Sequence, residues 1–289
     1  MPHGLARRPA YRPVRWQPVC RQSPATKLHL RSALRAAACC LAICLSAGHA
    51  AAGIEVVCHR GANEHCPENT YAAARKCIEW GVAYVEIDVR TSKDGVLYIL
   101  HDASVNRTTN GRGLLRSLTS EEIDKLDAGS WFNPSFADER VPKLEPYLRW
   151  IKGQAKVYFD VKDCDLPQLI KMVYDVGLEN DCFFWFDAPK RALEFRQLDA
   201  KLPLKVNART VDDVRLAKER YQANIVEVGV GQLTPELIAS CRELGLKVMA
   251  YEPQKKPDAF RQIVAAGVDM VNLNHGDLFL EIERAAQSK

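Results

Sequence analysis

Four ionisable side chains that could support acid–base and metal chemistry follow or lie in short apolar runs of the sequence. Glu86 and Asp88 are two residues apart in a strand-like run, so their carboxylates project from the same face. Two adjacent carboxylates repel each other unless a cation lies between them, and hard oxygen ligands favour Mg²⁺ or Ca²⁺ over zinc. His59 and His101 each follow another such run, and imidazole exchanges protons near neutral pH. The pattern indicates a metal site beside an acid–base pair; a solvated acidic strand face is the alternative.

Further polar side chains lie in or directly after these and other strand-like runs. Arg60 and Gly61 follow His59, and offer a bidentate phosphate ligand and close backbone approach. Asp160 and Lys162 place an acid and a base two residues apart in a later run. If these runs are parallel strands of a barrel, their polar ends meet on the face where such barrels carry their active sites.

The order of the elements supports that arrangement. From residue 54 onward, β-branched and aromatic runs alternate with segments of helical period, which is typical of βα units. Strands are predicted at 54–58, 84–90, 96–100, 156–161, 182–186, 204–206, 225–228, 247–251 and 270–273, and helices at 69–80, 166–176, 188–198, 235–244 and 258–266. We therefore predict an irregular (β/α)8 TIM barrel, with a doubly wound open sheet as the alternative.

One connection departs from a regular barrel. Only residues 91–95 separate the second and third strands, and a parallel crossover needs a dozen residues or more. Asp94 and Gly95 instead predict a two-residue hairpin turn, which would set Asp88 directly opposite His101 on a shared face. The third strand is followed by a small insertion, at about 103–150, that carries helical signals of its own and is a candidate for a functional role.

The first 52 residues are expected to form an N-terminal extension and a signal peptide, with the barrel domain in 53–289. Lys27, Arg31 and Arg35 precede an apolar run, 36–47, that ends in small residues. This run is too short to cross a bilayer as a helix, so no stable membrane span is expected. The protein is predicted to be exported, to the periplasm or outside the cell.

Charge and cysteine content exclude two classes of site. The formal net charge of +4 comes largely from arginines before residue 36, and from residue 53 onward acids and bases nearly balance, so no nucleic-acid partner is expected. Six cysteines follow the predicted signal, without a CxxC pair, which argues against zinc; they could form disulfides or remain buried thiols. Oligomeric state is left open.

Several motifs together resemble one enzyme family. Their order and spacing, from about residue 56 to 162, are similar to the glycerophosphodiester phosphodiesterase family, within the phospholipase C-like phosphodiesterases. The matching segments are His59-Arg60-Gly61, Pro67-Glu68-Asn69-Thr70, Glu86-x-Asp88, His101-Asp102, Arg107-Thr108-Thr109 and Val141-Pro142-Lys143-Leu144-Glu145.

The resemblance implies a hydrolase that converts small glycerophosphodiesters to sn-glycerol 3-phosphate and an alcohol. It implies one divalent cation, Mg²⁺ or Ca²⁺, and assigns the following roles: acid–base catalysis to His59 and His101, phosphate contacts to Arg60 and Lys162, and metal ligation to Glu86, Asp88 and Asp160. Alternatives are a related phosphodiesterase acting on intact phospholipid or lysophospholipid head groups, and a non-catalytic exported binding protein on the same fold.

The chain departs from the family pattern at three places. Asp160 replaces the usual glutamate, which shortens the third metal ligand by one methylene. Tyr251 stands where the family tends to carry tryptophan, and residues 272–277 replace its closing motif; both should flank the leaving-group side. Trp185 is a further candidate for the substrate cleft, with buried packing as its alternative.

Overall fold

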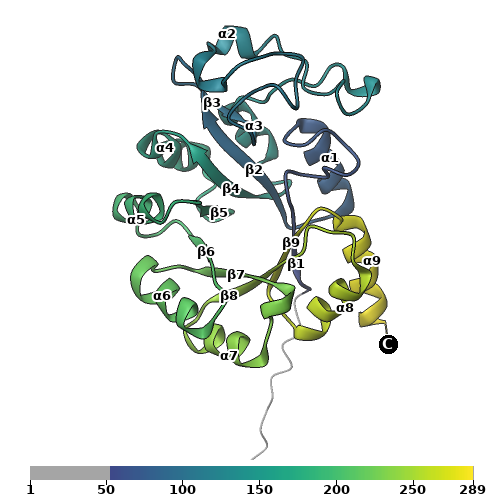
Figure 1. The fold of residues 1–289 in the computed structure, drawn as a ribbon, viewed down its shortest axis with the longest axis vertical. Helices are drawn as coiled ribbons and strands as arrows, with labels where there is room; N and C mark the ends of the chain where they lie inside the picture. The colour runs from purple at the N-terminus through teal and green to yellow at the C-terminus, as the bar shows by residue number, and fades with distance from the viewer. Residues whose placement is uncertain (1–52, 289) are drawn as a thin grey trace, which may run out of the picture. The chain divides into compact units, whose positions relative to one another are not determined.

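The computed structural model describes residues 53–288, and these residues form a barrel of parallel strands surrounded by helices (Figure 1). The parallel strands are β1 (Glu55–Cys58), β2 (Tyr84–Thr91), β4 (Lys156–Asp163), β5 (Cys182–Trp185), β6 (Lys205–Asn207), β7 (Ile225–Gly229), β8 (Lys247–Tyr251) and β9 (Met270–Leu273). Their order is β5-β4-β2-β1-β9-β8-β7-β6, and a bridge between Phe184 and Leu204 joins the two ends of that series. The predicted TIM barrel is confirmed.

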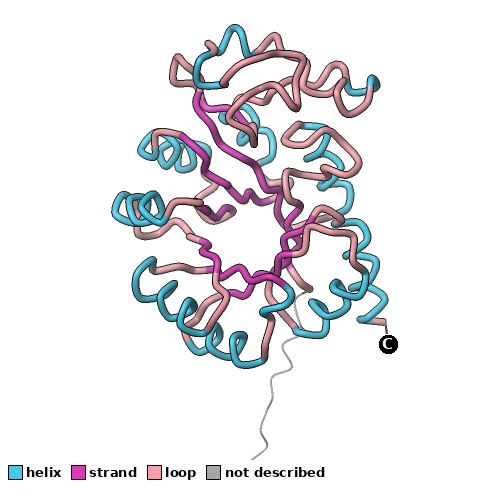
Figure 2. The backbone as a smooth tube through the Cα atoms, in the orientation of Figure 1, coloured by secondary structure: helices cyan, strands magenta, loops and turns pink. Residues whose placement is uncertain are grey.

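Helices cover the outside of this ring, as Figure 2 shows. They are α1 (Tyr71–Trp80), α3 (Leu144–Ile151), α4 (Leu166–Val176), α5 (Pro189–Leu198), α6 (Val211–Tyr221), α7 (Pro235–Glu243), α8 (Pro257–Ala266) and α9 (Gly276–Gln287). The predicted helices all occur, with ends shifted by no more than two residues. Our prediction placed no helix at three of these positions: at α3, at α6, whose buried residues are only Val214 and Ala217, and at α9, which begins three residues after β9.

Alternate residues of each strand pack on opposite sides of the barrel wall. Outward residues join the helices in the main core, whereas inward residues form a separate plug made of Val57, Tyr84, Tyr158, Phe183, Ile225, Met249 and Met270. Within the plug the rings of Tyr158 and Phe183 stack at 4.4 Å. The plug fills the interior toward the amino-terminal ends of the strands. Polar side chains further along the same inward rows therefore lie on the carboxyl-terminal side of an apolar layer.

The hairpin between β2 and β3 (Leu97–Ile99) differs from its predicted register. The strands are antiparallel as expected, but Val89 pairs with Ile99, and the amide of Leu100 donates to the carbonyl of Asp88. Asp88 is therefore opposite Leu100, and our pairing of Asp88 with His101 is wrong by one residue. The cause is the turn, which spans three residues rather than two and closes with Gly95 at φ 82°.

The segment after β3 has a small core of its own. Seven buried residues form it: Tyr98, Leu100, Val105, Leu115, Ile123, Ala128 and Val141. The short helix α2 (Ser120–Ile123) begins with a capping box between Thr119 and Glu122. The last part of the predicted insertion forms α3, which packs in the main core through Leu144 and Leu148.

The predicted signal peptide and the apolar run 36–47 lie outside the described residues. Within 53–288, no helix combines the length and the apolar character needed to span a bilayer. The six cysteines of this part of the chain, at positions 58, 66, 77, 164, 182 and 241, are free thiols, and all but Cys164 are buried.

Gly61, directly after the first strand's His-Arg pair, gives a test of how tightly this loop is packed. Gly61 and Gly81 both have positive φ, at 77° and 76°, but a Cβ on Gly61 would lie 2.7 Å from the Cβ of Ala73, whereas a Cβ on Gly81 meets nothing within 4 Å. Gly81→Ala should cost only backbone strain, about 1 kcal/mol. Gly61→Ala should cost about 1–3 kcal/mol more because of the overlap.

Denaturant unfolding of the two variants measures this difference. Equal losses of unfolding free energy would show that the Gly61 loop moves away from α1 without cost.

Candidate active site

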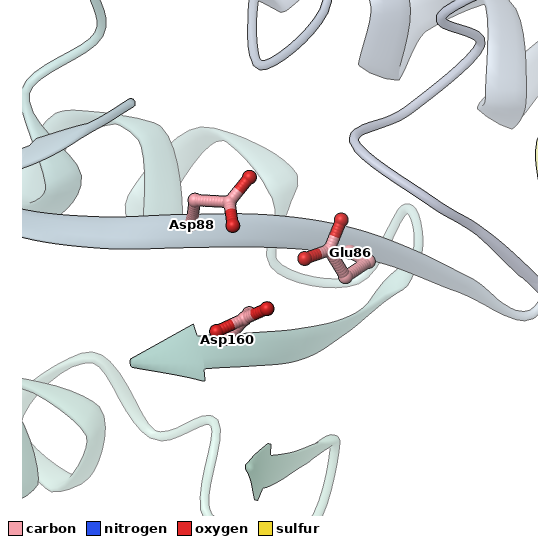
Figure 3. Close-up of side chains that lie close together, drawn as sticks. All are labelled: Glu86, Asp88 and Asp160. Carbon is pink, nitrogen blue, oxygen red and sulfur yellow. The ribbon is translucent and has the colours of Figure 1, made fainter. Parts of the chain in front are cut away.

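Three carboxylates lie together on the neighbouring strands β2 and β4 (Figure 3). Asp88 and Asp160 are direct partners across the two strands, and Glu86 is two residues before Asp88, so all three face the barrel interior. One oxygen from each lies within 4.8 Å of the others, and all three residues are buried. The strand register thus produces the acidic cluster that the sequence predicted for Glu86 and Asp88 and the resemblance extended to Asp160.

Each carboxylate has one oxygen fixed by a donor. Glu86 Oε2 accepts from the backbone amide of Arg60, Asp88 Oδ2 from Asn69 Nδ2 at 2.7 Å, and Asp160 Oδ2 from Lys162 Nζ at 2.6 Å. These contacts fix the rotamers of the three side chains. The remaining oxygens are oriented as a consequence.

The second oxygen of each carboxylate is buried and accepts no hydrogen bond from residues 53–288; these atoms are Glu86 Oε1, Asp88 Oδ1 and Asp160 Oδ1. Lys162 Nζ lies 3.1 Å from Asp88 Oδ1, close enough for an ion pair. Buried acceptors without a donor are rare, and an anionic one is the most unfavourable kind. An all-oxygen set of this kind fits a hard divalent cation such as Mg²⁺ or Ca²⁺.

The electrostatics of the cluster agree with this assignment. Burial, together with the carboxylates of Asp88 and Asp160, raises the pKa of Glu86 well above its usual value. Burial and Asp88 raise the pKa of Asp160 to about 6, although Lys162 opposes the shift. Ionising all three acids is therefore unfavourable without a compensating positive charge, which a bound cation supplies.

His59 lies directly after β1, and Asn274 orients its ring. Its Nδ1 is 2.9 Å from Asn274 Oδ1, which also accepts from Asn63 Nδ2 at 3.1 Å. Because this amide oxygen can only accept, Nδ1 carries the proton and Nε2 is left as a proton acceptor. Burial and the guanidinium of Arg60 lower the pKa of His59, which favours the neutral ring.

His101 belongs to a chain of charged contacts that ends at Arg60. Its Nδ1 is 2.8 Å from Asp102 Oδ1, and Arg107 donates to both oxygens of Asp102, at 2.8 and 2.9 Å. Arg107 also donates to both oxygens of Glu68, at 2.7 and 2.8 Å, and Glu68 accepts from Arg60 Nη1 at 3.1 Å. The second histidine and the first loop's arginine therefore hold each other in position through two carboxylates.

Arg60 has a left-handed backbone conformation, with φ 57°. Its side chain lies between the three carboxylates and the contacts that lead to His101. Its Nε lies 3.7 Å from Asp88 Oδ2 and donates to no acceptor among the described residues. The guanidinium thus keeps a donor for a ligand anion beside the acidic cluster.

The remaining predicted site residues also lie at strand ends. Trp185 ends β5, where it is half-buried beneath Lys162 Nζ, 5.6 Å from its ring centre, and it borders a cavity of about 220 Å³. Tyr251 ends β8, with its ring 6.1 Å from that of His59. Trp185 thus lines a hollow and also packs against the interior plug, and Tyr251 lies beside the first histidine.

Sequence reasoning missed two parts of the site. Asn274, the partner of His59, comes from the segment in which the family motif is absent. Lys205, Glu227 and Asn272 form a buried polar group on β6, β7 and β9. The sequence did hold a signal for both asparagines. Positions 272 and 274 follow Met270 at intervals of two, so their side chains project to the inward face of the last strand, as that of Met270 does.

Comparison with known proteins agrees with the geometry. A family model described as the glycerophosphoryl diester phosphodiesterase family matches residues 59–278. A putative glycerophosphodiester phosphodiesterase of Bacillus subtilis is 30% identical, over 78% of this chain and 96% of its own length. A glycerophosphodiester phosphodiesterase of Caldanaerobacter subterraneus is also 30% identical, over 79% of this chain and 97% of its own.

Solved structures show the same relationship. The crystal structure of a glycerophosphodiester phosphodiesterase from Agrobacterium tumefaciens has a TM-score of 0.76 and 35% identity, and covers 79% of this chain and 99% of its own. An Oleispira antarctica phosphodiesterase, solved with the product sn-glycerol-3-phosphate, shares the fold at a TM-score of 0.72 and 22% identity, over 80% of this chain and 96% of its own. With its site built on the strand ends where the family motifs fall, this chain belongs to the glycerophosphoryl diester phosphodiesterase family.

Proposed function

We propose that this protein hydrolyses glycerophosphodiesters to sn-glycerol 3-phosphate and an alcohol, using one divalent cation and two histidines. The observation that carries the proposal is the set of three buried carboxylates, each with one oxygen that accepts no hydrogen bond within residues 53–288, beside an arginine and an oriented histidine. The product in the Oleispira antarctica structure supports the choice of substrate class.

The cation would be held by Glu86, Asp88 and Asp160, and when bound it would polarise a phosphoryl oxygen and lower the pKa of a nearby hydroxyl. Arg60 and Lys162 would neutralise the remaining negative charge of the phosphate. Arg60 has an available Nε–H, and Lys162 is an ammonium whose pKa stays raised because Asp88 and Asp160 outweigh the effect of its burial. Both side chains favour the more negative transition state over the diester.

The two histidines differ in their hydrogen-bond partners, and this difference suggests their roles. The lowered pKa of His59 favours its neutral ring, and the hydrogen bond at Nδ1 leaves Nε2 as the proton acceptor, so His59 is suited to remove a proton from the attacking hydroxyl. His101 donates to a carboxylate, Asp102, which stabilises the positive charge of a protonated ring. His101 is therefore suited to protonate the leaving oxygen.

Removing either ring tests the proposal directly. His59→Ala and His101→Ala should each lower kcat by about 10²–10⁴-fold on glycerophosphocholine, because each removes one proton transfer. His65→Ala is the matched control: this histidine is paired with Asp277 at 3.1 Å on the surface, and activity should be kept. The assay is release of sn-glycerol 3-phosphate and choline.

The same assay separates the alternatives. Retained turnover in His59→Ala or His101→Ala would contradict the mechanism. Cation binding without turnover on glycerophosphocholine, lysophospholipid and phosphatidylinositol would instead identify a non-catalytic binding protein.

The lowered pKa of His59 predicts the acid side of the pH profile. A base acts only while neutral, and burial with Arg60 holds its pKa below the ordinary 6.5, so kcat/KM should stay high down to a pH below 6.5. The hydrogen bond that His59 Nδ1 donates to Asn274 Oδ1 opposes this shift, so Asn274→Ala should move the acid limb to still lower pH. Measurements at saturating cation keep the three carboxylates ionised. An acid limb at or above pH 6.5 would argue against His59 as the base.

Cation binding is predicted independently of activity. Titration calorimetry should find one Mg²⁺, Ca²⁺ or Mn²⁺ per chain, thermal unfolding should move upward with the ion, and EDTA should abolish turnover. Glu86→Gln keeps the acceptor for the Arg60 amide but removes one of three repelling charges. It should therefore stabilise the metal-free protein while weakening cation affinity by at least about tenfold.

The exposed Asp181 provides the matched control, since Asp181→Asn changes the same charge far from the cluster. Unchanged affinity in Glu86→Gln would place the ion elsewhere.

A further inference from the structure

A second polar group lies inside the barrel, on the strands that carry none of the three carboxylates. It consists of Lys205, Glu227 and Asn272, which are 2%, 8% and 3% exposed. Lys205 and Glu227 pair in register with Ile225 and Met249, two members of the interior plug, so their side chains face inward. We call these three residues the β6–β9 cluster.

Hydrogen bonds fix the orientation of the Asn272 amide in this cluster. Lys205 Nζ donates to Glu227 Oε1 at 2.9 Å, and Asn272 Nδ2 donates to Glu227 Oε2 at 3.1 Å. Since a carboxylate only accepts, the nitrogen of the amide must face Glu227 and the oxygen must face away. That oxygen, Asn272 Oδ1, is buried and accepts no hydrogen bond from any residue in 53–288. A carbonyl oriented in this way is a built acceptor site for a donor from outside the chain.

The cluster adjoins the proposed catalytic base. Asn274, two residues after Asn272, holds His59, and the carboxylate of Glu227 is close enough to His59 to act on its pKa. Around the ring, β7 lies across from β2, and only β1 separates β9 from β2. The β6–β9 cluster thus faces the same interior as the three carboxylates but comes from other strands. A diester's two alcohols leave phosphorus in different directions. If the glycerol binds at the carboxylates, the β6–β9 cluster is a polar surface that the other alcohol can meet.

Nearby charges restrict the kind of alcohol that fits. The ammonium groups of Lys205 and Lys162 lie 4.6 and 5.6 Å from the ring centre of Trp185. Both ammonium groups are paired with carboxylates, and they already occupy the positions near this ring that a quaternary ammonium would need. A neutral hydroxyl needs no such position, and it can donate to Asn272 Oδ1.

We propose that Asn272 Oδ1 accepts a hydrogen bond from a hydroxyl of the leaving alcohol, so that the enzyme selects diesters whose second alcohol is an uncharged polyol over those of choline or ethanolamine. The inference rests on the proposed function and adds a specificity-determining residue to it. Asn272 touches the substrate at a distance from the reacting atoms, so its effect falls on substrate selection.

Steady-state kinetics with glycerophosphoglycerol and glycerophosphocholine test the proposal. The wild-type protein should prefer the glycerol diester in kcat/KM. Asn272→Leu, which keeps the volume and removes the acceptor, should lower kcat/KM for glycerophosphoglycerol about tenfold more than for glycerophosphocholine, the worth of one hydrogen bond. Asn180→Leu, at an exposed position, should leave both values unchanged.

The outcomes are separable. Equal losses on both substrates, no loss on either, or a wild-type preference for glycerophosphocholine would overturn the inference while leaving the proposed function standing. Failure of the wild type to hydrolyse any diester would overturn both. Thermal unfolding checks that the variant folds; if Asn272→Leu does not, Asn272→Ser, whose hydroxyl falls short of the amide's reach, should show the same selective loss.

Discussion

The mutual repulsion of three buried carboxylates is the constraint on which the rest of the site depends. Glu86, Asp88 and Asp160 are brought within 4.8 Å by the register of two parallel strands, in an interior where like charges interact strongly. A backbone amide, a carboxamide and an ammonium each fix one oxygen of one acid. The second oxygens of the three acids remain close together in the same small space. The fold thus maintains a charge arrangement that is unfavourable unless a positive charge compensates it.

The neighbouring basic side chains and histidines are arranged around these carboxylates. Arg60 contacts the carboxylates on one side, and on the other it begins the chain through Glu68, Arg107 and Asp102 to His101. Bidentate guanidinium contacts restrict orientation as well as distance, so the long loop after β3 is held against the loop after β1. Two segments of irregular backbone are thereby joined by side-chain contacts rather than by strand pairing.

Much of this arrangement could be predicted from the sequence, because inward rows and strand ends follow from a period of two. That rule placed Glu86 beside Asp88, and the order of strands placed His59 on the same face. The pairing of Asp88 with His101 failed because the turn gained one residue, and a change of one residue reverses a face. The roles of Asn272 and Asn274 could not be predicted, since they depend on contacts with residues 45 and 215 positions away.

The pairing of β1 with β9 has a consequence for how the molecule is made. The first strand of the barrel hydrogen-bonds to the last, and His59 obtains its partner, Asn274, from the end of that last strand. During synthesis the carboxylates, His101 and Arg107 are all present long before residue 274 leaves the ribosome. A chain that stops before residue 274 therefore lacks the group that orients the ring of His59. Pairing of the first strand with the last thus closes the barrel and also completes the surroundings of His59.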